Sequence, residues 1–222
     1  AIGGFVLLNG LWRIAAPQAL GIVLLLALPA SLLVNRLPVP GPVLGNRDIG
    51  FWFVSQRMFP PVVSAFALFL FYAELNKQGI RLLDSYIGMV LAYTAFGLPL
   101  AVWLMIDFFK TVPLEVEEAA LVDDVPRWRI FFEIVVPMVR PGLLATFMIV
   151  LAFIWNEFLF ALLLTTSRWQ TLPVVLAGQV SSRGDEWWAI SAATLISIVP
   201  MMVVAILLGR MMRSGLIAGS IK

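Results

Sequence analysis

The sequence predicts an all-α membrane protein, a bundle of about five transmembrane helices in one domain that covers residues 1–222. Of the 222 residues, 61% are hydrophobic and 13% are charged, and the mean hydropathy is +0.98. Soluble domains are roughly half apolar and about a quarter charged, so this composition excludes that class. The apolar runs are too long for the alternating strands of a membrane barrel, which leaves helices.

The apolar runs themselves predict the spans. A helix needs about 20 residues to cross hydrocarbon about 30 Å thick. The stretches that meet this length are residues 11–34, 51–72, 86–109, 143–165 and 187–208. Interior prolines such as Pro29, Pro99 and Pro200 predict kinks, because neighbouring membrane helices can satisfy the carbonyls that a proline leaves free.

Between the third and fourth spans lies a polar passage, residues 110–140. We expect Thr111 to cap a helix that Pro113 begins, and glutamates in its first turns suit the positive end of the helix dipole. A proline further along disfavours helical geometry at the residue before it. This first helix should therefore end at Asp123 or Asp124.

A second short helix is expected to begin near Pro126 and to stop before Pro137. It places Arg129 and Glu133 four residues apart, a spacing that favours an ion pair. The two helices predict a docking surface for a protein partner. A helix resting on lipid is disfavoured, because such helices carry a basic polar face and the first of these is acidic.

Basic residues predict the orientation, because cytoplasmic loops carry an excess of Lys and Arg. Placing the 110–140 loop and the C terminus in the cytoplasm puts most of the 15 basic residues inside. The five that remain outside are Arg13, Lys77, Arg81, Arg168 and Arg183. Gln56 and Arg57 are expected at the inner interface, where an arginine can reach the headgroups, and a contact at an inner gate is the alternative. Aromatic residues do not alternate with the basic ones, so no nucleic acid is expected as a partner.

Within the polar passage, Glu118, Ala119, Ala120 and Asp123, followed by Ile134, Pro137 and Pro141, resemble the EAA loop of ATP-binding-cassette importer permeases. The family has glycine where this chain has Asp124, and aspartate is among the few residues that tolerate the left-handed turn required there. The coupling residues implied by the resemblance are Glu117, Glu118, Ala119, Ala120, Asp123, Asp124, Arg127, Ile134 and Pro137.

Further motifs resemble the carbohydrate branch of that family. Its WNEF signature is matched by Trp155, Asn156, Glu157 and Phe158. Residues 171–173 look like its TLP loop, and residues 215–222 resemble its C-terminal tail. Members of the branch usually have six spanning helices, and the resemblance begins at the second. The chain is therefore either a piece without the first helix or a shortened version.

The resemblance implies the fold of a type I importer permease in a bacterial plasma (inner) membrane. In that family two permeases form a pore, and two cytoplasmic ATPase subunits each bind an EAA loop. An external solute-binding protein delivers a sugar or oligosaccharide. The chain has no G-x-x-x-x-G-K-[ST] phosphate loop, so ATP and Mg are expected on the ATPase, and this subunit is expected to be no enzyme and to need no cofactor.

Two groups of residues are expected to meet the solute and its carrier. The pathway group is Trp155, Asn156, Glu157 and Phe158, because a carboxylate inside a membrane is costly and commonly functional. A hydrogen bond between two helices is the alternative for Asn156 and Glu157. The external loop, residues 166–186, supplies the expected binding-protein contacts Arg168, Thr171, Leu172, Pro173 and Val174.

Two alternatives remain at this point. The EAA loop does not fix the solute, so the chain could instead import polyamines, amino acids or another small solute such as phosphate. An intramembrane enzyme with Glu157 or Asp107 as acid or base is disfavoured, because no second carboxylate, metal cluster or Ser/His pair accompanies either residue. Asp107 is expected only to meet headgroups or Lys110.

Overall fold

The structure, a computed structural model, describes residues 16–36, 45–178 and 187–219. These residues form helices and turns with no strand, which confirms the all-α fold class. The helices are α2 (Ala16–Arg36), α3 (Asn46–Ser55), α4 (Pro61–Lys77), α5 (Tyr86–Lys110), α6 (Leu114–Val122), α7 (Arg127–Arg129), the π-helix η1 (Ile130–Val135), α8 (Val136–Met138), α9 (Arg140–Trp155), α10 (Leu159–Leu164), α11 (Leu172–Ala177) and α12 (Trp187–Gly219).

Within the described ranges, two helices are long and apolar enough to cross a membrane, α5 and Ile190–Met211 of α12. A third results if Arg127–Met138 and Arg140–Trp155, which meet at an angle of 70°, count as one span. The apolar part of α2, Ala19–Ser31, is shorter. The predicted span at 86–109 therefore corresponds closely to α5.

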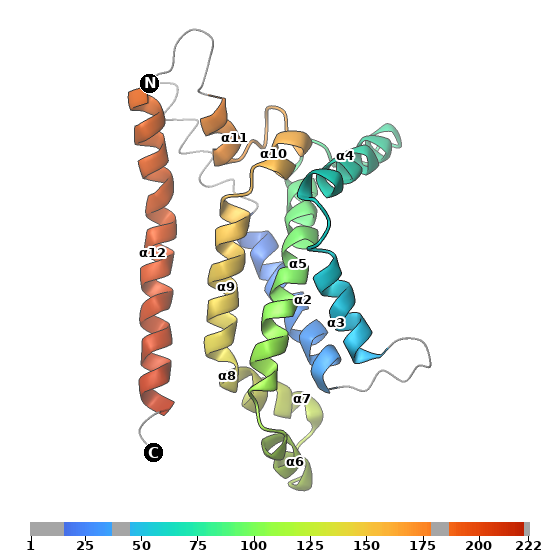
Figure 1. Cartoon of the computed structure of the whole chain (residues 1–222), viewed down its shortest axis with the longest axis vertical. Coiled ribbons are helices and arrows are strands. Elements are labelled where there is room, and N and C mark those ends of the chain that lie inside the picture. The colour runs from blue at the N-terminus through green and yellow to red at the C-terminus, as the bar shows by residue number, and fades with distance from the viewer. Residues whose placement is uncertain (1–15, 37–44, 179–186, 220–222) are drawn as a thin grey trace.

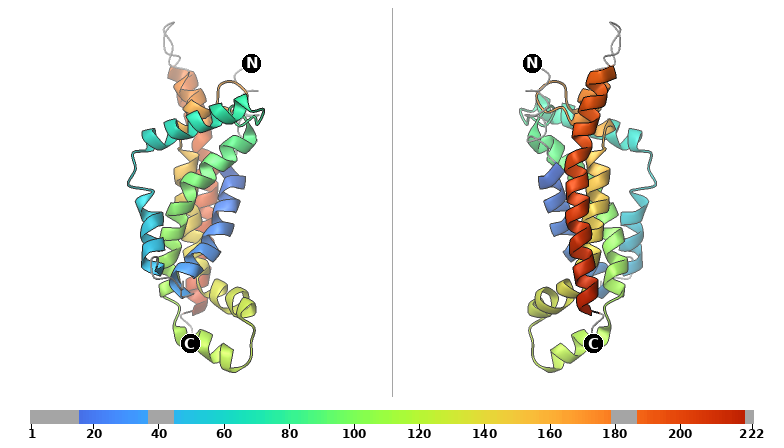
Figure 2. Two further views of the ribbon diagram at one scale, coloured as in Figure 1. Left: turned by 90° about the vertical axis from the view of Figure 1, so that its right-hand side faces the viewer. Right: turned by 90° about the vertical axis from the view of Figure 1, so that its left-hand side faces the viewer.

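α5 is the centre of the bundle, with α2 and α9 packed along it (Figures 1 and 2). The three helices meet at Gly97, where an added Cβ would lie 3.3 Å from both Val23 of α2 and Ile154 of α9. Glycine suits this crossing, because an added Cβ would require its neighbours to give way by a few tenths of an ångström. Tyr93 and Phe109, at different heights of α5, are almost fully buried.

The predicted span at residues 51–72 is wrong as a single helix. α3 ends at Ser55 and α4 begins at Pro61, and the break falls at two consecutive prolines that cannot donate to a helical ladder. After the break α4 runs across one end of the bundle rather than through it (Figure 1). The Gly88 amide then donates to the Ser85 hydroxyl (3.0 Å), which caps the start of α5.

Gln56 and Arg57 form the connection between α3 and α4, which corrects their expected place at the inner interface. The Arg57 guanidinium lies 4.8 Å from the ring centroid of Phe96 and 5.3 Å from that of Phe153. These rings belong to α5 and α9, so Arg57 lies among the helices. Cation–π contacts with the two rings replace the headgroups that were expected to stabilise its charge.

The predicted span at residues 143–165 is also broken. α9 begins at Arg140 and ends at Trp155, and the separate helix α10 starts at Leu159. The WNEF signature consists of the last residue of α9 and the three residues that follow it, so a sequence motif coincides with the break between two helices.

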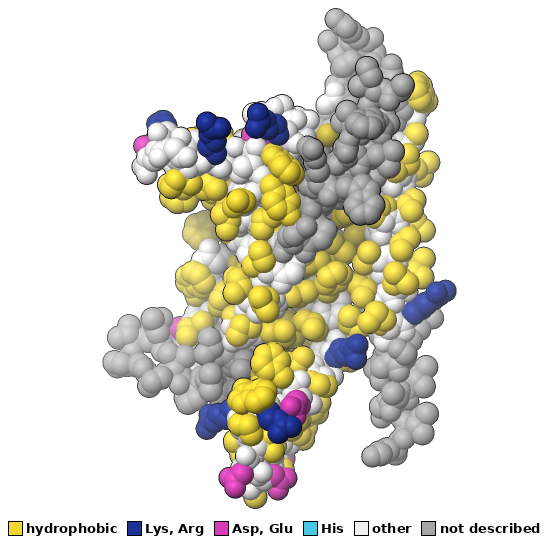
Figure 3. Space-filling view, turned by 180° about the vertical axis from the view of Figure 1, so that it is seen from behind, with side chains coloured by type: hydrophobic (Ala, Val, Ile, Leu, Met, Phe, Trp, Pro, Cys, Tyr) yellow, Lys and Arg dark blue, Asp and Glu magenta, His cyan; other side chains and the backbone are white. Residues whose placement is uncertain are grey.

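α12 lies beside α9 at the edge of the bundle and continues well past the predicted end of the span at residue 208 (Figure 2). Its exposed apolar side chains include Leu195, Ile196, Val199, Met202, Val203, Ile206 and Leu207. Hydrophobic side chains also cover the middle of the back face of the molecule, while charged ones gather toward its two ends (Figure 3). This pattern suits a bundle whose middle lies in lipid.

The two ends of the bundle carry different elements. α6, α7, η1, α8 and the C-terminal end of α12 lie at one end, which we call the α6 end (Figure 1). α4, α10 and α11 lie at the opposite end, the α4 end.

Candidate functional site

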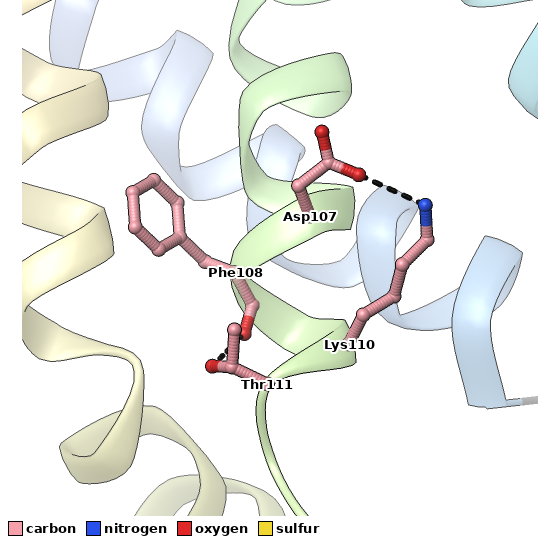
Figure 4. Close-up of polar contacts among 4 residues, drawn as sticks. All are labelled: Asp107, Phe108, Lys110 and Thr111. Atoms are coloured by element: carbon pink, nitrogen blue, oxygen red, sulfur yellow. Dashed lines mark hydrogen bonds and ion pairs between the residues drawn. The ribbon is translucent and has the colours of Figure 1, made fainter.

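The loop at the α6 end starts where α5 stops. The Thr111 hydroxyl donates to the Phe108 carbonyl (2.7 Å), and Asp107 pairs with Lys110 (2.8 Å), as expected for that aspartate (Figure 4). The cap that Thr111 was expected to give α6 is therefore wrong, because its hydroxyl closes the last turn of α5. Pro113 occupies the N-cap position of α6 instead.

Phe108 points from the same turn toward α9 (Figure 4). Its ring covers Gly142 so closely that a Cβ there would lie 2.1 Å from Phe108 Cγ. α5 and α9, the two helices that enter and leave the loop, are therefore in direct contact at its base.

α6 presents an acidic and partly apolar surface. Glu115 and Glu118 are exposed, and Glu117 is half-buried. Val122 at the end of the helix is 83% exposed, whereas Ala120 is buried. The predicted acidic helix is thus present, with its small residue Ala120 facing the protein and an apolar tip facing away.

The end of α6 is a Schellman turn. The Val125 amide donates to the Ala120 carbonyl (3.0 Å), and the Asp124 amide donates to the Leu121 carbonyl (3.1 Å). Asp124 has φ 55°, which confirms the left-handed turn predicted at this position. The end of α6 near Asp123 is confirmed as well.

This geometry makes a prediction about Asp124. The substitution Asp124→Gly should stabilise the turn by about 1 kcal/mol, because left-handed geometry costs a non-glycine residue roughly 1–2 kcal/mol and the unfolded chain's greater freedom offsets part of the gain. Asp124→Val should weaken it, because a β-branched residue tolerates positive φ poorly. Hydrogen exchange of the α6 amides, followed by mass spectrometry, measures the effect.

The control for this experiment is Asp123→Gly. Asp123 lies one residue earlier at φ −82°, where glycine gives no conformational advantage. Faster exchange in the Asp124→Gly variant than in the unmodified chain would contradict the prediction.

The second half of the loop begins after Pro126, as predicted, and Arg129 pairs with Glu133 (2.9 Å). Its end was predicted wrongly, because the helix does not stop before Pro137. The wide π-turn of η1 leads into α8, and Pro137 lies in the first turn of α8, where its missing N–H is not needed. Arg127 and Pro137 are exposed.

Both halves of the loop share a small hydrophobic core with the end of α5. The buried members are Met105, Phe109, Val112, Ala120, Ile130, Val135 and Val139, with Ile134 packed against them. α6 contributes Ala120 to this core and the end of α5 contributes Met105 and Phe109, so the core joins the two helices. Ala119 is exposed and lies outside this core.

The break between α9 and α10 holds the expected pathway residues. Glu157 is 8% exposed, and its carboxylate accepts hydrogen bonds from the amides of Phe160 (2.8 Å) and Ala161 (3.2 Å) at the start of α10. The side-chain amide of Asn156 donates to the Ala152 carbonyl (2.8 Å), and Asn156 is exposed. Trp155 is half-buried beside it, and Phe158 is exposed.

Glu157 also connects to other elements. The buried hydroxyl of Tyr93 in α5 lies beside its carboxylate, and the Thr171 hydroxyl lies beside that of Tyr93. A polar cluster in the interior therefore links the centre of the bundle to the segment that the sequence assigned to the external loop.

That segment lies at the α4 end. Arg168 is exposed, Thr171, Leu172 and Pro173 are half-buried, and Val174 in α11 is buried against the main core. Residues 179–186 of the predicted loop lie outside the described residues. The residues that were predicted to contact the binding protein all lie on this described stretch.

The sequence reasoning missed Asp84, in the loop before α5. Its carboxylate accepts hydrogen bonds from the amides and hydroxyls of Thr166 and Ser167 and from the amides of Arg168 and Trp169. Burial raises the pKa of Asp84, but the hydrogen bonds outweigh it and lower the pKa below the usual value. The contribution of Asp84 to stability is therefore present above the usual aspartate pKa and is lost as the pH falls through the lowered one.

No local signal marks Asp84, because its partners lie more than 80 positions away in the sequence. Only the packing of the loop before α5 against the segment after α10 brings the carboxylate and these amides together.

Comparisons with known proteins agree with this arrangement. The family profile described as binding-protein-dependent transport system inner membrane component matches residues 47–216. The putative ABC transporter permease protein ORF1 of Streptomyces antibioticus is 38% identical, over 77% of this chain and 73% of that protein. The trehalose/maltose transport system permease protein MalG of Thermococcus litoralis is 32% identical, over 87% of this chain and 67% of that protein. The diacetylchitobiose uptake system permease protein NgcG of Streptomyces coelicolor is 31% identical, over 86% and 61%.

Two solved structures share the fold. A chain of the MetNI methionine ABC transporter in an inward-facing conformation has a TM-score of 0.75 at 14% identity, over 95% of this chain and 96% of that one. A chain of a bacterial ABC transporter involved in the import of the acidic polysaccharide alginate has a TM-score of 0.66 at 19% identity, over 90% and 74%. The chain spans between 58% and 73% of the length of the first three curated relatives.

Proposed function

Because the chain belongs to the family of binding-protein-dependent transport system inner membrane components, we propose that it is the permease subunit of an ATP-driven ABC importer. In this role it provides half of a membrane pore and hydrolyses nothing itself. A second permease, two cytoplasmic ATPase subunits and an external solute-binding protein complete the transporter. ATP and Mg belong to the ATPase subunits.

The proposal rests on the way in which α6 packs against the rest of the bundle. Its acidic and apolar tip is free to meet a partner, while Ala120 shares a core with Phe109 of α5. Phe108 in turn lies against Gly142 of α9. In this proposal a displacement of α6 by the ATPase also moves α5 and α9, because packed cores shift as units. Coupling between an ATPase and a pore requires such a movement.

This role sets the orientation. The α6 end and the C-terminal end of α12 face the cytoplasm, where ATP is available, and the α4 end faces outside. The binding protein then docks on residues 166–186, with Arg168, Thr171, Leu172, Pro173 and Val174 as contacts. The membrane is a bacterial plasma membrane, which the chain crosses several times.

The proposed solute is a sugar or an oligosaccharide. Relatives over most of the chain carry the names of trehalose/maltose and diacetylchitobiose permeases. Trp155, Asn156, Glu157 and Phe158 line or shape the pathway in this proposal. Asn156 is exposed and suited to bind a hydroxylated solute, whereas the buried Glu157 holds the start of α10.

Reconstitution of the whole transporter tests the proposal. We expect ATPase activity to rise several-fold when trehalose- or maltose-loaded binding protein is added, because such a complex couples hydrolysis to delivery. Binding proteins loaded with a polyamine or an amino acid serve as controls. Stimulation only by one of these would contradict the sugar assignment, and no stimulation by any of them would contradict the importer itself.

A further inference from the structure

We infer that Asp84 is a positioning residue, which fixes residues 166–174 in the shape that the binding protein recognises. The inference rests on the proposed function, because it assigns a task to the surface that receives the solute. Asp84 does not itself touch the solute in this scheme. It acts through the backbone of the segment that it holds.

The contact is unusually complete for a single side chain. Four consecutive amides converge on the Asp84 carboxylate, those of Thr166 (3.2 Å), Ser167 (3.4 Å), Arg168 (3.2 Å) and Trp169 (3.3 Å). The hydroxyls of Thr166 (3.0 Å) and Ser167 (3.4 Å) add two donors. Successive amides that turn toward one point form an anion-binding nest, here occupied by a carboxylate of the same chain. Hydrogen bonds to a charged group are roughly twice as strong as neutral ones.

Asp84 is itself held in place. Its amide donates to the Leu164 carbonyl (2.8 Å), and its φ of 49° puts it in left-handed geometry. The Asn76 side chain accepts hydrogen bonds from the amides of Leu82 (2.7 Å) and Leu83 (3.3 Å) just before it. A residue kept in a costly conformation by surrounding contacts is a mark of a constrained site.

The segment is anchored at two further points, and side chains beside the first of them are exposed. Trp169 packs on Tyr86 with ring centroids 5.2 Å apart, and Val174 is buried in the main core. Arg168 and Gln170, on either side of Trp169, are exposed. The Asp84 carboxylate holds the backbone amides of the segment. The surface offered to a partner therefore consists of side chains that project from a fixed backbone. A preordered surface binds more tightly, because less conformational entropy is lost on docking.

The test compares Asp84→Asn with Glu74→Gln. Both variants remove one negative charge at the α4 end, but Glu74 is exposed and pairs with Lys77 of its own helix (2.9 Å). In Asp84→Asn, an amide NH₂ replaces one acceptor and faces the backbone donors. Thr166→Val is a milder variant, because it removes only the hydroxyl that donates to Asp84. The chain contains no cysteine, so Arg168→Cys gives a unique attachment point for a spin label in a complex whose other subunits lack cysteine.

Two quantities are measured on the assembled transporter, the mobility of the label at position 168 and the stimulation of unlabelled complexes by trehalose-loaded binding protein. We expect Asp84→Asn to increase label mobility and to raise the half-maximal binding-protein concentration about 10-fold, with a much smaller change in the maximal rate. Thr166→Val should have an intermediate effect, and Glu74→Gln none on either quantity.

An Asp84→Asn variant with the label mobility of Glu74→Gln would overturn the inference. A more mobile label with an unchanged half-maximal binding-protein concentration would also overturn it. Asp84 would then hold the segment, but the binding protein would not recognise the segment's shape. Failure of the proposed function is a distinct result, since the unmodified complex would then show no stimulation at all.

Discussion

The substitution Glu118→Lys is expected to weaken ATPase association about 30-fold or more and to abolish most transport. Glu118 is exposed on α6, the helix that is proposed to enter the ATPase, and reversing its charge there replaces attraction or a neutral contact by repulsion. Residues near the centre of an interface commonly contribute about 2 kcal/mol or more, which corresponds to the expected 30-fold change. Co-purification of the ATPase with tagged permease measures the first effect, and sugar uptake into proteoliposomes measures the second.

Glu74→Lys is the matched control, because it makes the same charge reversal on an exposed helix at the opposite end of the molecule. This variant should retain the ATPase. If Glu118→Lys co-purified and transported like the unmodified complex, α6 would not be the coupling element.

The second large effect is expected from Gly142→Ala, which should lower the stability of the purified permease by about 1–3 kcal/mol, as overpacking of an interior does. The new Cβ would lie 2.1 Å from Cγ of Phe108 and 2.4 and 2.6 Å from its two Cδ atoms. These atoms form the base of the ring, so the ring cannot give way without moving α5. The thermal unfolding midpoint in detergent measures the effect.

Gly21→Ala provides the control, because Gly21 lies in α2 with open space around the added Cβ. Alanine favours a helix by about 1 kcal/mol over glycine, so this variant should be as stable as the unmodified chain or more stable. The double variant Phe108→Ala with Gly142→Ala should recover part of the loss beyond additivity, which identifies the contact as the cause. Equal midpoints for Gly142→Ala and Gly21→Ala would show that α5 and α9 are not in close contact here.

The features that the sequence predicted correctly depend on neighbours in the chain. Helix length predicts the span at 86–109, and capping signals predict the end of α6 near Asp123 and the left-handed Asp124. Four-residue spacing predicts the pairing of Arg129 with Glu133. The family assignment also came from short motifs, and the comparisons confirm it. The roles of Asn156 and Glu157 in the pathway stay a prediction.

The misplaced features are breaks inside apolar runs and contacts between distant segments. Hydropathy measures the preference of a run for lipid, and it does not tell whether the run is one helix or two. Hydropathy therefore predicts a single span for each of the apolar stretches at 51–72 and 143–165. Arg57 was expected at the interface because its aromatic partners Phe96 and Phe153 lie far along the chain.

Composition and local spacing predict a helical membrane protein with an acidic two-helix loop, and short motifs predict the permease family, because each of these signals lies within a short stretch of chain. The helices that meet at Gly97 and Gly142, and the hold of Asp84 on the segment after α10, are seen only in the folded molecule. Each of these depends on which atoms come within a few ångströms across tens of residues of chain. Such proximity is a property of the packed bundle and leaves no trace in the local pattern of the sequence.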